Sequence, residues 1–217
     1  MPSHGQYTFL LIYPHRSARK AHPLLRNIRE SVRGRGVPRL NEPQKSPSGV
    51  KEIEMEMQTL QDLMVENLKD LYSAETQILK AGPKMAKAIG NDKLRKAVEQ
   101  HLKETEEQVE RLKQIFEDLG EKPTGHKCKG MEGLLTENKE MMEEDADPDV
   151  LDAGLIVGQQ KVEHYEIAGY GSAVTFAKLL GNNKAAKLLA QTLAEEKKAD
   201  ELLTKLAEST INVEAQQ

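Results

Sequence analysis

The sequence predicts an all-α fold, an antiparallel four-helix bundle with a long crossover that carries a short extra helix. From residue 57 onward, apolar residues recur every three or four positions, which is the period of an amphipathic helix. Turn residues divide this periodic sequence into segments of helical length. The chain has three Phe, five Tyr and no Trp, and it is rich in Leu, Ala, Glu and Lys, which favour helix.

The first two segments form a hairpin. The first helix is expected over residues 58–89, with a bend at Gly82-Pro83, because proline removes a helical hydrogen bond. Gly90-Asn91-Asp92 is a turn signal. The second helix continues to about Leu119, where Gly120 is a typical C-cap.

The second pair of helices follows a long crossover at residues 121–148, in which residues 131–144 are expected to form a short helix. Pro148 suits the first turn of the third helix, which we expect to end near Leu180. Gly181-Asn182 then turns the chain, and the fourth helix runs to about Glu208.

The two hairpins resemble each other at an offset of 91 residues. Gly90-Asn91 matches Gly181-Asn182, and Glu75 matches Glu166. Two similar hairpins joined by one long crossover describe the ferritin-like connection of a four-helix bundle. A chance match between Lys-, Leu- and Ala-rich helices is the alternative.

The net charge of −4 hides an asymmetry. Residues 1–50 carry nine Lys and Arg against two Glu, a balance of +7, whereas the other 167 residues balance to −11. The acidic bundle is therefore not expected to bind nucleic acid. Only the basic segment offers that alternative, or a targeting role.

Three regions follow from this division. We expect residues 1–54 to be a disordered leader or a mis-assigned start, with translation beginning at Met55 or Met57. Residues 55–210 should form the bundle, and residues 211–217 a flexible tail. The single cysteine permits no internal disulfide, and no apolar run approaches the ~20 residues of a membrane span, so we expect a cytoplasmic protein that does not cross a membrane.

Glutamates occupy positions that the helical period assigns to the interior. Glu75, Glu166 and Glu196 each lie one turn from apolar inner-face residues, and Glu104 lies at the edge of its inner face. Counting from the turns, Glu75 is level with Glu104 to within two residues, or roughly 3 Å along the axis, and Glu166 is level with Glu196 to the same degree. A core tolerates several carboxylates if a cation compensates them.

Helical spacing adds two further candidates. Glu163 lies three residues before Glu166, and Asp200 lies four residues after Glu196. A carboxylate-rich set predicts a site for two iron or two manganese ions, with Glu75, Glu104, Glu163, Glu166, Glu196 and Asp200 as ligands. The alternative is that these are structural or solvated glutamates. His101 is expected to hydrogen-bond within the core rather than to act as a ligand, because it lies about five residues below the level of Glu75.

Several segments together resemble the YciE/YciF family of bacterial stress proteins over about residues 57–207. They are Leu60-Gln61-Asp62-Leu63, Asp70-Leu71-Tyr72-Ser73-Ala74-Glu75, His101-Leu102-Lys103-Glu104-Thr105, Met131-Glu132-Gly133-Leu134, Lys161-Val162-Glu163-His164-Tyr165-Glu166-Ile167-Ala168-Gly169-Tyr170-Gly171 and Leu193-Ala194-Glu195-Glu196. The resemblance implies a ferritin-like fold close to rubrerythrin, a homodimer, and induction under osmotic or oxidative stress.

The wider superfamily has Glu-x-x-His motifs on its second and fourth helices, and this chain departs from them. Three residues after Glu104 comes Glu107, and three residues after Glu196 comes Ala199. Gln108 and Asp200 are the candidate substitutes. The internal repeat aligns Glu104 with Glu195, but the inner face selects Glu196, which we prefer.

Two functions remain open from the sequence. The first is a dinuclear iron or manganese protein of stress defence that handles a small substrate such as peroxide or ferrous iron, as a peroxidase, catalase or ferroxidase would. The second is a metal-free structural or interaction dimer that protects cell components under stress.

Overall fold

The computed structural model describes residues 57–124 and 126–217, and within these residues the chain is helical with short connections. The predicted leader, residues 1–54, lies outside the described residues. The helices are α1 (Leu60–Ala88), α2 (Asp92–Leu119), α3 (Lys129–Glu143), α4 (Pro148–Leu179), α5 (Asn183–Leu206), the π-helix η2 (Ala207–Ile211) and α6 (Asn212–Glu214). No described helix is long and apolar enough to cross a membrane.

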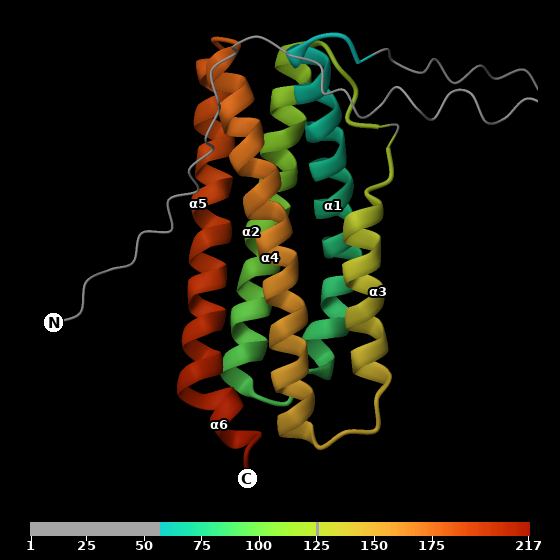
Figure 1. Ribbon diagram of the computed structural model, residues 1–217, viewed down its shortest axis with the longest axis vertical. Helices are drawn as coiled ribbons and strands as arrows, with labels where there is room; N and C mark the ends of the chain where they lie inside the picture. The colour runs from blue at the N-terminus through green and yellow to red at the C-terminus, as the bar shows by residue number, and fades with distance from the viewer. Residues whose placement is uncertain (1–56, 125) are drawn as a thin grey trace, which may run out of the picture. The chain divides into compact units, whose positions relative to one another are not determined.

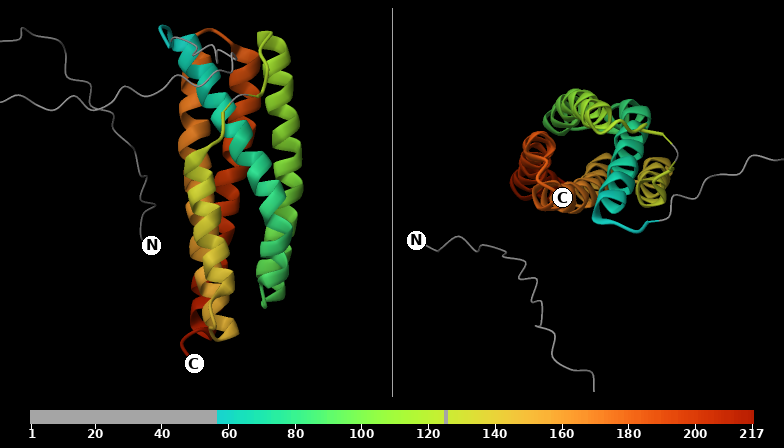
Figure 2. Two further views of the ribbon diagram at one scale, coloured as in Figure 1. Left: turned by 90° about the vertical axis from the view of Figure 1, so that its right-hand side faces the viewer. Right: turned by 90° about the horizontal axis from the view of Figure 1, so that it is seen from above.

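Four long helices form the predicted antiparallel bundle. Helices α1 and α2 make one hairpin and α4 and α5 the other, and the hairpins join through contacts of α1 with α4 and of α2 with α5 (Figure 1). The crossover descends the length of the bundle, and its helix α3 packs outside the four, against α1 and α4 (Figures 1 and 2).

Local signals set the helix ends as expected. Thr59 and Asp62 form a reciprocal capping box at the start of α1, and the side chain of Asn91 caps α2. Helix α2 ends at Gly120 with φ of 69°, a left-handed conformation that glycine adopts without strain. Pro83 lies within α1, which continues to Ala88.

Apolar side chains fill both ends of the bundle, buried polar groups gather in its middle, and a third apolar cluster lies where α3 packs on α1 and α4. One core cluster surrounds Leu68, Leu112 and Leu189, and another surrounds Leu94 and Leu155. Between these clusters the interior is lined by buried glutamates and glutamines. Packing at both ends therefore holds the polar middle at a fixed geometry.

The C-terminal segment, which we expected to be a flexible tail, is helical as far as Glu214. The wider turn of η2 brings Ile211 inward, where it is 1% exposed in the same core cluster as Leu203. An apolar residue thus anchors the end of the bundle.

Candidate metal centre

Four glutamates from three helices meet in the middle of the bundle. Glu75 lies on α1, Glu163 and Glu166 on α4, and Glu196 on α5, each with 0% exposure. Helix α2 adds His101, which is 7% exposed. One ligand atom from His101, Glu163, Glu166 and Glu196 can be chosen so that all four lie within 4.8 Å of one another. We call these five residues the glutamate–histidine cluster.

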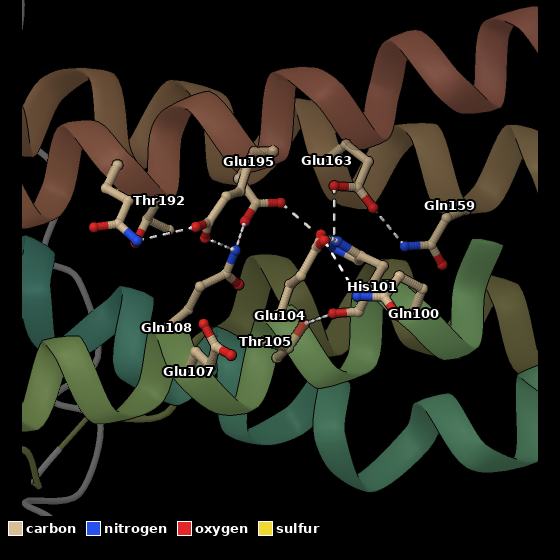
Figure 3. Close-up of polar contacts among 12 residues, drawn as sticks. Gln100, His101, Glu104, Thr105, Glu107, Gln108, Gln159, Glu163, Thr192 and Glu195 are labelled. Carbon is tan, nitrogen blue, oxygen red and sulfur yellow. Dashed lines mark hydrogen bonds and ion pairs between the residues drawn. The ribbon is translucent and has the colours of Figure 1, made fainter. Parts of the chain in front are cut away.

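His101 connects α2 to the carboxylates of α4 and α5. Its Nε2 lies 3.3 Å from Oε2 of Glu163 and 3.5 Å from Oε2 of Glu196, whereas its Nδ1 faces Glu104 at 3.7 Å (Figure 3). Burial alone would lower the pKa of His101, but the charge of Glu163 and the contact with Glu104 outweigh burial and raise it. The imidazole therefore offers partial charge compensation to the cluster.

Three neutral side chains orient the carboxylates. The amide of Gln108 donates to Glu196, the amide of Gln159 donates to Oε1 of Glu163 over 2.6 Å, and the hydroxyl of Tyr170 donates to Oε1 of Glu75. Gln108 and Gln159 are both labelled in Figure 3. Each of these glutamates is thereby held in place through one of its two carboxylate oxygens. The other oxygen of each makes no hydrogen bond within the described residues.

Five carboxylate oxygens are buried without a hydrogen-bond partner among the residues that the structure describes. They are Oε2 of Glu75, Oε2 of Glu163, both oxygens of Glu166 and Oε2 of Glu196. His101 faces the oxygens of Glu163 and Glu196, but the unpartnered oxygens of Glu75 and Glu166 have no such neighbour in the described part of the chain. A buried carboxylate that stays ionised without a partner costs several kcal/mol. Two carboxylates cannot donate to each other, so the contact between Glu75 and Glu166 requires a proton or a cation.

Protons can fill this role at neutral pH when no cation is bound. Burial raises the pKa of Glu75 to about 7. Burial and the neighbouring carboxylates, Glu75 for Glu166 and Glu163 for Glu196, raise the pKa of both of these glutamates well above the ordinary value. Such a set of perturbed groups in one cluster is typical of functional sites.

The cluster fits the cations that the sequence suggested. Four carboxylates carry four negative charges, which two divalent ions would neutralise. A set of carboxylate oxygens with one imidazole nitrogen suits iron or manganese. The orphaned oxygens show that ligand atoms are available without breaking existing hydrogen bonds.

Two of the six predicted ligands lie outside the cluster. The side chain of Glu104 is 26% exposed and lies at its edge, against Nδ1 of His101. Asp200 faces the outer side of α4, where it accepts from Gln160 over 3.3 Å and pairs with His164 at 3.2 Å. The structure therefore brings Glu75, Glu163, Glu166 and Glu196 together, leaves Glu104 at the edge of the cluster and places Asp200 apart from it.

The choice between neighbouring glutamates on α5 agrees with the geometry. Glu196 is fully buried in the cluster, whereas Glu195 turns aside and pairs with Arg111 at 2.6 Å. Helical rotation separates consecutive residues by about 100°, so only one of the two can point inward. Arg111 also donates to Thr192 over 2.9 Å, which ties α2 to α5 beside the cluster.

Sequence reasoning expected His101 to hydrogen-bond within the core, and it did not name Gln159 as a candidate for the site. His101 precedes Glu104 by three residues, and Gln159 precedes Glu163 by four, so each shares a face with a predicted ligand. That spacing was the available signal. Counting levels from the turns compared His101 with Glu75, whereas the structure places its Nε2 beside Glu163 and Glu196.

Comparisons with known proteins identify the family. A family model described as "Domain of unknown function (DUF892)" matches residues 59–216. Protein YciF of Escherichia coli K12 is 47% identical over 163 residues, which cover 75% of this chain and 98% of YciF. The chain belongs to the YciF family. The resemblance predicted from the sequence is thus confirmed.

Solved structures agree with this assignment. The crystal structure of the E. coli stress protein YciF matches with a TM-score of 0.70 and 47% identity over 72% of this chain and 99% of its own. YcfI of Rhodopseudomonas palustris, described as a candidate structural protein, matches with a TM-score of 0.67 and 43% identity over 70% and 96%. A Xanthomonas campestris protein shares the fold at 21% identity and a TM-score of 0.59, over 73% and 97%.

Proposed function

We propose that this YciF-family chain binds two iron or manganese ions in the glutamate–histidine cluster and acts in stress defence, reducing peroxide or oxidising ferrous iron. The observation that carries the proposal is the set of five carboxylate oxygens, on four fully buried glutamates, that have no hydrogen-bond partner among the described residues. A fold without a cation or protons there would bear a cost of several kcal/mol for each charge. The description of E. coli YciF as a stress protein supports the physiological setting.

Each side chain has a defined part in this proposal. Glu75, Glu163, Glu166 and Glu196, with His101, hold the metal ions, and the carboxylates release protons as the ions bind. Bound ions would supply the two electrons that, with two protons, convert hydrogen peroxide to two waters. Gln108, Gln159 and Tyr170 keep the carboxylates oriented through their existing hydrogen bonds.

Metal stoichiometry tests the proposal directly. Metal-free protein is incubated anaerobically with ferrous iron or with manganese, freed of excess ion, and analysed by mass spectrometry for metal per chain. We expect two ions per chain for the natural sequence and for Asp200→Asn, because Asp200 faces outward. Glu166→Gln should reduce the content to one ion or fewer. Less than half an ion per natural chain would overturn the proposal.

A metal-free structural role is the second candidate, and the description of the R. palustris relative favours it. The two proposals differ in the effect of the double change Glu75→Ala with Glu166→Ala. A metal-free bundle should gain stability with or without added ions, because repulsion between buried carboxylates is removed. If the cluster is a metal centre, the double change should instead lower the melting temperature of the metal-loaded protein.

A further inference from the structure

A small cavity of about 80 Å³ lies between α2 and α5 and reaches the glutamate–histidine cluster. Its floor includes His101 and Glu163, two members of the cluster. Its apolar walls are formed by Ala97, Val98, Ala199, Leu202 and Leu203. Its remaining lining is polar and comes from Gln100, Glu104, Gln159 and Lys198.

This cavity opens on the surface, because several of its lining residues are exposed. Leu202 is 43% exposed, and Gln100 and Lys198 are exposed as well. The cavity therefore connects solvent to a cluster whose carboxylates are themselves fully buried.

We propose that this cavity is the entrance through which a small neutral oxidant of the hydrogen peroxide class reaches the cluster, and that Ala199 and Leu202 set the size it admits. The choice of oxidant rests on the proposed function, whereas the existence of the entrance rests on the cavity alone. On the α5 side the lining consists of Lys198, Ala199, Leu202 and Leu203. A larger side chain at Ala199 would narrow the entrance, and a smaller one at the exposed Leu202 would widen it.

The size of the cavity selects among oxidants. An engineered apolar cavity of about 150 Å³ holds benzene. The entrance has about half that volume. Hydrogen peroxide, with two heavy atoms, fits this space, whereas the phenyl ring of cumene hydroperoxide does not.

The apolar part of the lining favours a neutral molecule over a hydrated cation. Glu104 and Lys198 carry opposite charges, and the walls between them are apolar. A cation would lose hydration along these walls before it reached Glu163. A neutral oxidant bears no such cost.

A larger cavity on the opposite side of the bundle does not serve as this entrance. It has a volume of about 170 Å³ between α1, α3 and α4, and it extends inward to Gln159. None of the cluster's glutamates lines it, and the amide of Gln159 is held by Glu163 on the far side. Gln159 therefore separates this cavity from the carboxylates.

Labelling of metal-free protein with diethyl pyrocarbonate tests the entrance without any metal. The reagent is much larger than hydrogen peroxide, and mass spectrometry of peptides measures the rate at which it modifies each histidine at fixed pH. His101 should react far more slowly than His164, whose side chain is 68% exposed. Leu202→Ala should speed the modification of His101 several-fold. Leu179→Ala removes a leucine that is 72% exposed on α4 and should leave the rate unchanged.

A second experiment uses protein loaded with ferrous iron and follows its oxidation by absorbance. Leu202→Ala should speed the oxidation of iron by cumene hydroperoxide and leave its oxidation by hydrogen peroxide unchanged. Ala199→Phe should slow the oxidation of iron by hydrogen peroxide. Circular dichroism checks that each variant is folded. If the chain binds no iron, the proposed function fails, and the labelling of His101 still decides the entrance. Equal rates at His101 in the natural, Leu202→Ala and Leu179→Ala proteins would overturn it.

Discussion

Raising the pH should destabilise the metal-free protein, because its buried glutamates must then ionise without a partner. The pKa of Glu75 is raised from 4.5 to about 7 in the folded chain. A proton is thus bound to the folded state, and not to the unfolded state, between these two values. The stability that this proton contributes is complete below pH 4.5 and is lost as the pH rises through about 7.

The size of the effect follows from the shift in pKa. A shift of about 2.5 units at 1.36 kcal/mol per unit corresponds to about 3 kcal/mol for Glu75. Glu166, Glu196 and His101 also have raised pKa values and therefore act in the same direction. For a domain of this size, about 3 kcal/mol corresponds to a fall in melting temperature of roughly 6–12 °C.

Urea unfolding followed by circular dichroism, with a chelator present, measures this loss across the pH range. Glu75→Gln is the matched control, because its carboxamide has the same size but does not titrate. As the pH rises, the free energy of unfolding of Glu75→Gln should fall by about 3 kcal/mol less than that of the natural chain. Added manganese should abolish the loss, since bound ions replace the protons. Metal-free protein that is as stable above pH 7 as below pH 5 would refute the reasoning.

Two substitutions test contacts that α4 makes with α3 and with the turn between α1 and α2, each by urea unfolding. Gly158→Ala should destabilise the fold by about 1–3 kcal/mol, because the new Cβ would lie 1.6 Å from Oδ1 of Asn138, and adding Asn138→Ala should recover part of the loss. Asp152→Ala should cost about 1–3 kcal/mol, because its buried carboxylate accepts from the backbone N–H groups of Gly90 and Asn91 at 2.9 and 2.6 Å. A change below the error of the measurement in either single variant would contradict the corresponding contact.

The fold was predictable because its signals are local and repeated. Heptad-like apolar spacing, capping residues and paired turns all agree with one another, and the order of hairpin, crossover and hairpin leaves few topologies. The position of Ile211 was not predictable in this way. Its inward direction depends on the wider turn of η2, which changes the helical phase after Leu206.

The buried glutamates were predictable because each interrupts an apolar stripe, but the outer limits of the site were not. Asp200 follows Glu196 by four residues, and a step of four turns a helix about 40° past a full turn. At the edge of a buried face this rotation is enough to bring a side chain out, and Asp200 meets Gln160 and His164 there instead. Spacing alone cannot decide such a case, because the answer depends on how the neighbouring helix is rotated.

The position of the histidine that α5 lacks lies at the proposed entrance to the cluster. The ferritin-like superfamily that the sequence resembles has a histidine three residues after the position of Glu196. This chain has Ala199 there, which forms part of the wall of the cavity between α2 and α5. A histidine at this position would fill much of that space. His101, three residues before Glu104, instead directs an imidazole from the neighbouring helix α2 toward Glu163 and Glu196. The proposed centre would thus keep one nitrogen donor, from α2, while the small side chain of Ala199 forms part of the wall of the proposed entrance.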